Sequence, residues 1–391
     1  MDKIDVIVIG AGAAGLMSAL SVGNRGRKVL VLDHSNKVGK KILMSGGGRC
    51  NFTNYDIQPE NYISQNPHFC KSALSRYTQW DFIALVEKHG IAYHEKKLGQ
   101  LFCDNKSKDI LNMLLDECNQ AKATIRDHCG VEKITKTEQG FKVKTNQGDF
   151  SCESLVIATG GLSIPKMGAT GFGYELAKQF GLEVLATQAA LVPFTLNDRM
   201  KVDFSALSGT SVDAIVTCNG QSFRENILFT HRGLSGPAIL QISSYWNQGD
   251  TITIDLMPDC NVVELLNTNS KKQLNTVLNE IFSKKLANTL CELWFERLAF
   301  KALAEVSKQS KEQIAKQLTS WQFKPNGTEG YRTAEVTRGG IDTDEVSSKT
   351  FESKKVKGLY FVGEVLDVSA HLGGYNFQWA WSSGFAAGQF A

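Results

Sequence analysis

The N-terminal segment carries the pattern that most limits how this chain can fold. Residues 4–9 form a continuous apolar run, and Gly10-Ala11-Gly12-Ala13-Ala14-Gly15 follows at once. A second apolar run covers 28–32, and Asp33 stands directly after it. A G-x-G-x-x-G turn between a buried strand and a helix, with an acid after the next strand, is typical of a dinucleotide-binding βαβ unit. The sequence therefore predicts an α/β fold of Rossmann type, in which Asp33 accepts hydrogen bonds from ribose hydroxyls.

Each position of the glycine motif has its own expected role. Gly10 makes the tight turn, Gly12 lets the backbone approach a pyrophosphate, and Gly15 lets the helix pack closely on the strand. Ala13 and Ala14 open a helix whose free N–H groups and dipole favour phosphate. The alternative is a glycine-rich turn that holds no ligand.

The motif alone does not distinguish FAD from NAD. A second glycine cluster, Ser45 to Asn51, fits backbone that lies against a flat ligand, although a flexible surface loop is an open alternative. Lys41 fits either a phosphate or flavin contact or a solvated surface lysine. A third glycine turn follows the apolar run 154–158. The expected cofactor-contacting residues beyond the first motif include Lys41, Gly47, Gly48, Asn51, Val131, Ala158, Thr159 and Gly160.

The remaining pattern predicts a division into domains. Segments 68–90 and 107–123 have helical periodicity, and Val131 to Phe150 alternates as a hairpin. Short alternating runs from Leu191 to Pro258 indicate an antiparallel β unit, and 262–321 is helical. We therefore predict an FAD-binding domain from 1–190 and 335–391, a β cap domain from 191–260 and 321–334, and a helical insertion over 261–320.

Three further segments resemble known flavoproteins. Gly358 to Glu364 resembles the flavin-ribityl motif of two-dinucleotide-binding-domain flavoproteins, which implies that Gly363 and Glu364 hold ribityl or phosphate-linked groups. Thr337-Arg338-Gly339-Gly340-Ile341 resembles a motif of fumarate-reductase and succinate-dehydrogenase flavoproteins. Gly168 to Tyr174 resembles another motif of theirs, although Phe172 replaces its aspartate.

A narrower resemblance covers nearly the whole chain. The segments Gly39 to Asn54, Thr230 to Pro237 and Gly373 to Ala380 resemble the YhiN/BaiN-type, or aminoacetone-oxidase-like, family of FAD- and NAD(P)-dependent oxidoreductases. The resemblance implies a two-dinucleotide-binding-domain FAD fold with an inserted β cap and a helical insertion. It also implies flavin contacts from Gly374, Tyr375, Asn376 and Phe377, at a helix start that is otherwise an ordinary glycine N-cap. One branch is associated with reduction of conjugated carbon–carbon double bonds in steroid acids.

Three residues are the candidates for catalysis. His231 and Arg232 lie in the expected cap, where they suit protonating a substrate carbon or clamping a carboxylate. A structural turn held by glycines is an equally open interpretation of that segment. Arg338, and also His371, are expected near flavin N5. Cys50 lies in the second glycine cluster, where packing is its expected role.

The expected activity is hydride transfer through FAD, with NAD(P)H as donor and a small molecule with an activated double bond as acceptor. No second G-x-G-x-x-G follows, so NAD(P)H is expected to bind transiently. The alternatives are an FAD-dependent amine oxidase that uses oxygen, and a low-turnover flavin redox sensor or RNA-modification partner.

Composition narrows the partners and the compartment. The formal net charge is +3, and the absence of a basic cluster predicts that nucleic acid is not a partner. Nine scattered cysteines without a Cys-x-x-Cys pair predict free thiols in a reducing cytoplasm and no metal site. No apolar stretch is long enough for a membrane span.

Overall fold

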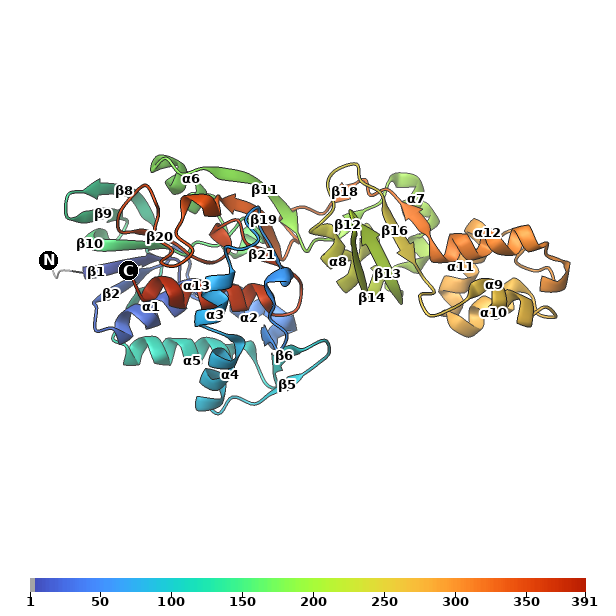
Figure 1. Cartoon of the computed structure of the whole chain (residues 1–391), viewed down its shortest axis with the longest axis horizontal. Helices are drawn as coiled ribbons and strands as arrows, with labels where there is room; N and C mark the ends of the chain where they lie inside the picture. The colour runs from blue at the N-terminus through green and yellow to red at the C-terminus, as the bar shows by residue number, and fades with distance from the viewer. Residues whose placement is uncertain (1–3) are drawn as a thin grey trace. The chain divides into compact units, whose positions relative to one another are not determined.

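The computed structural model describes residues 4–391 and divides the chain into two units. Unit 1 combines the chain up to Gln188 with Val336–Ala391, and unit 2 is Ala189–Glu335. Each unit has its own cluster of buried apolar side chains. Figure 1 labels the elements of both units.

The largest sheet of unit 1 has the strand order β7-β2-β1-β10-β9-β8, with β20 also paired to β10. β10 (Gly148–Ile157) pairs in parallel with β1 (Ile4–Ile9) and β20 (Leu359–Phe361), while its first half pairs antiparallel with β9. The other strands are β2 (Val29–Leu32), β7 (Thr124–Arg126), β8 (Val131–Thr137) and β9 (Gly140–Thr145). The carboxyl ends of β1, β2, β10 and β20 therefore meet at one edge, where ligands bind in open α/β sheets.

Helix α1 (Ala13–Asn24) connects β1 to β2 and packs between α5 (Ser107–Gln120) and α13 (Tyr375–Gly388). Figure 1 shows α1 beside α13. The contact is close because two glycines of α13 face α1. A Cβ on Gly384 would lie 2.5 Å from the Ala14 carbonyl oxygen, and one on Gly388 would lie 2.4 Å from Ser21 Cβ.

Smaller elements complete unit 1. A three-stranded sheet has the order β3-β6-β5, and two further pairs are β21 with β4 and β11 with β19. Their bounds are β3 (Asn51–Asn54), β4 (Tyr62–Ile63), β5 (Tyr93–Glu95), β6 (Gln100–Cys103), β11 (Val184–Ala190), β19 (Val336–Ile341) and β21 (Ser369–Ala370). The remaining helices are α2 (Lys40–Met44), α3 (Lys71–Arg76), α4 (Gln79–Lys88) and α6 (Phe172–Gln179).

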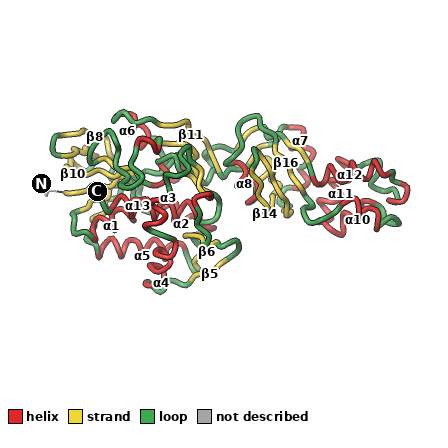
Figure 2. The backbone as a smooth tube through the Cα atoms, in the orientation of Figure 1, coloured by secondary structure: helices red, strands yellow, loops and turns green. Residues whose placement is uncertain are grey.

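Unit 2 joins an antiparallel sheet to a group of helices, which Figure 2 shows as separate yellow and red regions. The sheet order is β17-β16-β13-β14-β15-β12-β18. The strands are β12 (Phe194–Thr195), β13 (Ser211–Cys218), β14 (Gln221–Phe229), β15 (Gly233–Ser235), β16 (Ile252–Asp255), β17 (Trp321–Phe323) and β18 (Gly327–Thr328). The helices are α7 (Asp198–Asp203), α8 (Pro237–Ser243), α9 (Val262–Thr268), α10 (Leu274–Ile281), α11 (Lys284–Trp294) and α12 (Lys308–Thr319). One buried apolar cluster runs through both regions.

The predicted α/β fold of Rossmann type is confirmed, and one helix prediction is wrong. Segment 68–90 is two helices, α3 and α4, rather than one. Thr78 has extended backbone, and its hydroxyl accepts from the Asp81 N–H while the Asp81 carboxylate accepts from the Thr78 N–H. This reciprocal cap starts a new helix where the apolar periodicity alone predicts continuation.

Candidate functional site

The glycine motif closes β1 onto α1 through two contacts that exclude a side chain. Gly10 has φ of +105°, and a Cβ there would lie 2.4 Å from the Ala158 carbonyl oxygen. A Cβ on Gly15 would lie 1.8 Å from the Gly10 carbonyl oxygen. Gly12 differs, because no atom of the described residues lies within 4 Å of the Cβ it lacks. Gly12 therefore leaves open space at the start of α1 that a ligand phosphate fits.

The N-terminus of α1 is electrostatically suited to an anion. Gly12 is its N-cap residue, no side chain caps the helix, and its first turn contains no acidic residue. The N–H groups of that turn and the positive end of the helix dipole are therefore available to phosphate.

Asp33 lies beside this turn and is held by backbone. Its carboxylate accepts the Ala11 N–H at 2.7 Å and the Ser35 N–H at 2.8 Å. The Cys129 N–H donates to the Asp33 carbonyl oxygen at 2.8 Å, which brings the segment leading to Val131 next to Asp33. Asp33, which is predicted to contact ribose, is thus bonded to Cys129 at the end of β2, two residues before Val131, which is predicted to contact the cofactor.

The turn after β10 contains a buried hydroxyl without a partner. The Ala158 N–H donates to the Ile9 carbonyl oxygen at 2.8 Å, so the turn lies against the end of β1. Thr159 Oγ1 is buried and has no hydrogen bond among the described residues, and Gly160 has φ of +71°. An unsatisfied buried hydroxyl costs about 1–3 kcal/mol, so its position fits contact with a bound ligand.

Lys41 and Glu364 form one bridge across unit 1. Lys41 Nζ lies 2.8 Å from one Glu364 carboxylate oxygen, and the Thr337 N–H donates to the other at 2.9 Å. Gly363, with φ of +72°, packs against α1, since a Cβ there would lie 2.9 Å from Ala14 Cβ. Glu364 is therefore fixed between α2 and β19, at the carboxyl end of β20.

The second glycine cluster approaches the N-terminus of α13. Gly47 and Gly48 have φ of +66° and +88°, and no described atom lies within 4 Å of the Cβ that either lacks. Asn51, with its amide oriented to satisfy both of its polar atoms, accepts the Gly374 N–H at 3.1 Å. Gly374 itself needs to be glycine, because its φ is +95° and a Cβ would lie 2.3 Å from the Thr53 carbonyl oxygen.

The start of α13 repeats the features of α1. Gly374 is its N-cap, no side chain caps it, and the turn opened by Tyr375, Asn376 and Phe377 contains no acid. The Asn376 side chain bonds to the Ala370 N–H at 2.9 Å and to the Ala370 carbonyl oxygen at 3.0 Å. Its side chain therefore shapes the loop before α13, and its backbone N–H lies at the helix start.

Helices α1 and α13 point in the same direction but begin at different positions along it. Ala14 lies against Gly384 and Ser21 against Gly388, so α1 and α13 run the same way. Because Tyr375 precedes Gly384 by nine residues at 1.5 Å each, α13 begins about 14 Å beyond the start of α1. One positive helix end for a pyrophosphate and a second for a ring that gains negative charge suit an extended FAD. The residues present therefore fit this cofactor.

Arg338 belongs to a polar cluster on the same unit. It bonds to the Gln188 side-chain oxygen, and burial lowers its pKa while Asp367 opposes the shift. The Asp367 carboxylate accepts the Gln65 N–H at 2.8 Å, and burial raises its pKa. Burial lowers the pKa of His371 to about 4, so its imidazole is neutral at pH 7, and its ring lies edge-on to Tyr375 at 6.2 Å between centroids.

Sequence reasoning missed Asp367, although an acidic residue within the apolar run 365–368 was a visible signal. It also missed Thr337 as the backbone partner of Glu364. That contact joins residues 27 positions apart and has no local signature.

His231 and Arg232 lie in a tight turn of unit 2 between β14 and β15. The Thr230 hydroxyl accepts the N–H groups of Arg232 and Gly233, and the Arg232 guanidinium pairs with Glu329 at 3.2 Å. His231 is exposed. The Thr230 hydroxyl and the Arg232–Glu329 ion pair therefore stabilise this turn, as expected if the segment has a structural role. Catalytic roles for His231 and Arg232 stay predictions.

Residues 4–391 contain neither a metal-binding cluster nor a helix suited to a membrane. No group of three or more histidine, cysteine or carboxylate side chains in that range is placed to hold a metal ion. None of the helices described is both long and apolar enough to cross a bilayer. All nine cysteines are free, and burial raises the pKa of Cys50 to about 12.

Comparisons with known proteins agree over the full chain. The profile of the HI0933-like protein Rossmann domain matches residues 4–390. The ribosomal RNA dihydrouridine synthase of Escherichia coli K12 is 53% identical over 392 residues, covering 100% of this chain and 98% of that protein. The 3-dehydro-bile acid delta(4,6)-reductase of Clostridium scindens is 29% identical, covering 100% and 99%.

A solved structure of the quinol fumarate reductase of Escherichia coli aligns with 99% of this chain, and the alignment covers 69% of that structure's chain. The TM-score is 0.49 at 17% identity. The profile match and the full-length relative give the same answer: the chain belongs to the HI0933-like Rossmann family of FAD-binding oxidoreductases.

Proposed function

We propose that this protein reduces the C5–C6 double bond of a uridine in ribosomal RNA to give dihydrouridine. The observation that carries the proposal is the 53% identity to a ribosomal RNA dihydrouridine synthase, over 100% of this chain and 98% of that protein. The proposal replaces the expected small-molecule substrate and goes against the expectation that nucleic acid is not a partner.

The reaction class is common to both named relatives. A 3-dehydro-bile acid delta(4,6)-reductase acts, by its name, on double bonds conjugated to a carbonyl. The C5–C6 bond of uracil is likewise conjugated to the C4 carbonyl. In both acceptors hydride adds to the carbon remote from the carbonyl, negative charge develops on the carbonyl oxygen, and a proton from solvent then adds to the carbon next to the carbonyl. This is the activated double bond that the sequence predicts as acceptor.

We propose that FAD is held by the residues predicted for it. Gly12, Ala13 and Ala14 would hold the pyrophosphate, Asp33 would hold the adenosine ribose, and the start of α13 would hold the flavin pyrimidine. When bound and reduced, the flavin supplies the hydride. The α13 N-terminus would stabilise negative charge on the pyrimidine through its N–H groups and dipole.

Arg338 is proposed to stabilise the charge that develops on the uracil O4. A guanidinium that is partly withdrawn from water provides more stabilisation than an exposed one. His371 accepts or donates a hydrogen bond as a neutral imidazole and does not serve as an imidazolium acid at pH 7.

The electron donor is proposed to be NADH or NADPH. Anaerobic mixing of the purified flavoprotein with each nucleotide, followed by stopped-flow absorbance, is expected to bleach the flavin band. A flavin that stays oxidised with both but is reduced by dithionite would refute this donor. Amine-dependent peroxide formation in that case would favour the amine oxidase.

The substrate is tested in cells. Ribosomal RNA from a strain that lacks the gene is digested and its dihydrouridine measured by mass spectrometry. The wild-type gene is expected to restore the dihydrouridine, and Arg338→Ala to reduce the rate by about 100-fold or more. Arg199→Ala, an arginine with a 91% exposed side chain, is the control and should restore it fully. Unchanged dihydrouridine between the strains with and without the gene would refute the function.

A further inference from the structure

The two regions of unit 2 carry opposite charge. Residues 261–320 contain nine lysines and arginines against six aspartates and glutamates. Residues 191–260 contain four against seven. Within this unit, a polyanion is therefore attracted to the helical region and repelled by the sheet region.

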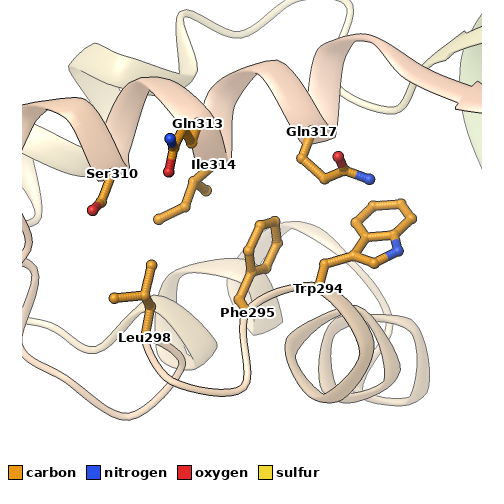
Figure 3. Close-up of a pocket in the computed structure, with 7 residues that line it drawn as sticks. All are labelled: Trp294, Phe295, Leu298, Ser310, Gln313, Ile314 and Gln317. Carbon is orange, nitrogen blue, oxygen red and sulfur yellow. The ribbon is translucent and has the colours of Figure 1, made fainter.

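The helical region also contains a pocket. Its volume is about 300 Å³, at the lower end of the range for ligand pockets. Figure 3 shows that Trp294, Phe295 and Leu298 line one side and that residues of α12 face them from the other. The α12 residues include Gln313, Ile314 and Gln317. The pocket thus joins an apolar floor to a rim of side-chain amides.

The lining matches the chemistry of a nucleobase. The Trp294 indole N–H and the amides of Gln313 and Gln317 have no hydrogen bond to any part of residues 4–391. A base presents a flat π-face to apolar and aromatic side chains, and its edge carries both donors and acceptors for amides. A lipid chain or an aliphatic side chain would contact the apolar floor and make no hydrogen bond with these polar groups.

The aromatic platform is rigid. The Trp294 ring lies 5.3 Å from the ring of Trp321, and Trp321 is buried in the core of unit 2. Phe295 is buried beside it. A platform fixed by the core loses little conformational entropy when a base stacks on it.

Basic side chains stand next to the lining residues in the sequence. Arg297 and Lys301 lie in the turn that contains Leu298, and Lys316 precedes Gln317. All three are exposed, and none has an ion pair within the part of the chain described. They can neutralise phosphates on either side of a bound nucleotide.

We propose that this pocket binds an unstacked base of the RNA substrate, while Arg297, Lys301 and Lys316 contact the adjoining phosphates. The inference rests on the proposed function, since that function makes RNA the substrate. The pocket is a second contact on unit 2 that anchors the RNA in addition to the base that is reduced.

The test uses the full-length flavoprotein and two probes: a fluorescein-labelled single-stranded uridine-rich 12-mer, and protein-free ribosomal RNA from the strain that lacks the gene. Trp294→Leu is expected to weaken binding by about 5- to 150-fold, as for loss of one stacked base. Gln317→Glu is expected to weaken it at least fivefold by placing a carboxylate beside the phosphates. Arg297→Gln is expected to reduce the slope of log affinity against log salt by about one.

The controls are Trp80→Leu and Gln322→Glu, which change an exposed tryptophan and an exposed glutamine that do not line the pocket. Melting temperature and flavin absorbance establish that each variant is folded. If Gln317→Glu and a folded Trp294→Leu both bind the probes as the wild type does, the inference is overturned.

Failure of the inference and failure of the proposed function give different results. A wild-type protein that restores dihydrouridine but binds RNA independently of the pocket overturns the inference alone. A wild-type protein that binds RNA through the pocket and forms no dihydrouridine overturns the function alone.

Discussion

Replacing Gly12 with alanine should separate cofactor binding from folding. Gly12 has φ of −87°, which alanine adopts without strain, and no atom of the described residues lies within 4 Å of the added Cβ. The gain from a less flexible unfolded chain, about 0.4–1 kcal/mol, is roughly cancelled because alanine is a poorer N-cap than glycine. The apoprotein should therefore unfold within about 0.5 kcal/mol of the wild type.

The same methyl group should weaken FAD binding. If the pyrophosphate lies against the Gly12 backbone, a Cβ occupies the space of a phosphate oxygen or pushes it from the N–H groups of α1. Loss of one charge-assisted hydrogen bond costs about 1.5–3 kcal/mol, which is about a 10- to 150-fold weaker affinity.

Gly15→Ala is the matched variant in the same motif. Its Cβ would lie 1.8 Å from the Gly10 carbonyl oxygen, so α1 must move away from β1 by more than an ångström. Overpacking of this kind costs about 1–3 kcal/mol, and the apoprotein itself should melt several degrees lower. Calorimetry of apoproteins and titration of FAD by flavin fluorescence measure both quantities. FAD affinity at the wild-type level in Gly12→Ala would refute the placement of the pyrophosphate.

Three further predictions follow from charge and burial. Glu364→Gln removes the carboxylate that lies 2.8 Å from Lys41 Nζ, and the variant should release flavin several-fold faster after dilution. An unchanged rate of flavin release would show that Glu364 does not help to hold the cofactor. Burial raises the pKa of Cys50 to about 12, so iodoacetamide at pH 8 should modify the half-exposed Cys260 first, and early labelling of Cys50 in the folded protein would contradict its burial. Burial lowers the pKa of His371 to about 4, so between pH 6.5 and 4 the unfolded state binds more protons and stability falls as pH falls. His371→Gln should lessen that fall by at most about 3 kcal/mol in urea denaturation, and an unaltered pH profile would show that His371 is not the group responsible.

Much of the fold of unit 1 could be predicted from the sequence, because the motifs that indicate it are formed by residues close together in the chain. Gly10, Gly12 and Gly15 are adjacent in sequence to the strand and helix that they join, and the structure gives Gly10 and Gly15 a steric reason. The end of β20 was also recognisable, because Gly363 and Glu364 directly follow an apolar run. Motifs of this kind are read from periodicity and spacing without knowledge of distant contacts.

Contacts between distant segments were not predictable in the same way. Asn51 meets Gly374, and Lys41 meets Glu364 across 323 residues. The break between α3 and α4 depends on Thr78, whose capping role competes with a helical pattern that continues through it. In each case the tertiary partner or a side-chain cap decides the outcome, and the local sequence does not name it.

The similarity to a ribosomal RNA dihydrouridine synthase puts the expectation against RNA in question, and that expectation rested on the total charge of the chain. A net charge of +3 over 391 residues describes the field far from the molecule, whereas salt screens charges beyond about 10 Å. What a phosphate experiences is therefore the charge of the nearest region. In unit 2 the sheet region is net acidic and the helical region net basic, and their sum conceals both. A basic surface beside an aromatic pocket is thus compatible with an unremarkable total charge, and the salt dependence of the Arg297 variant measures that local field directly.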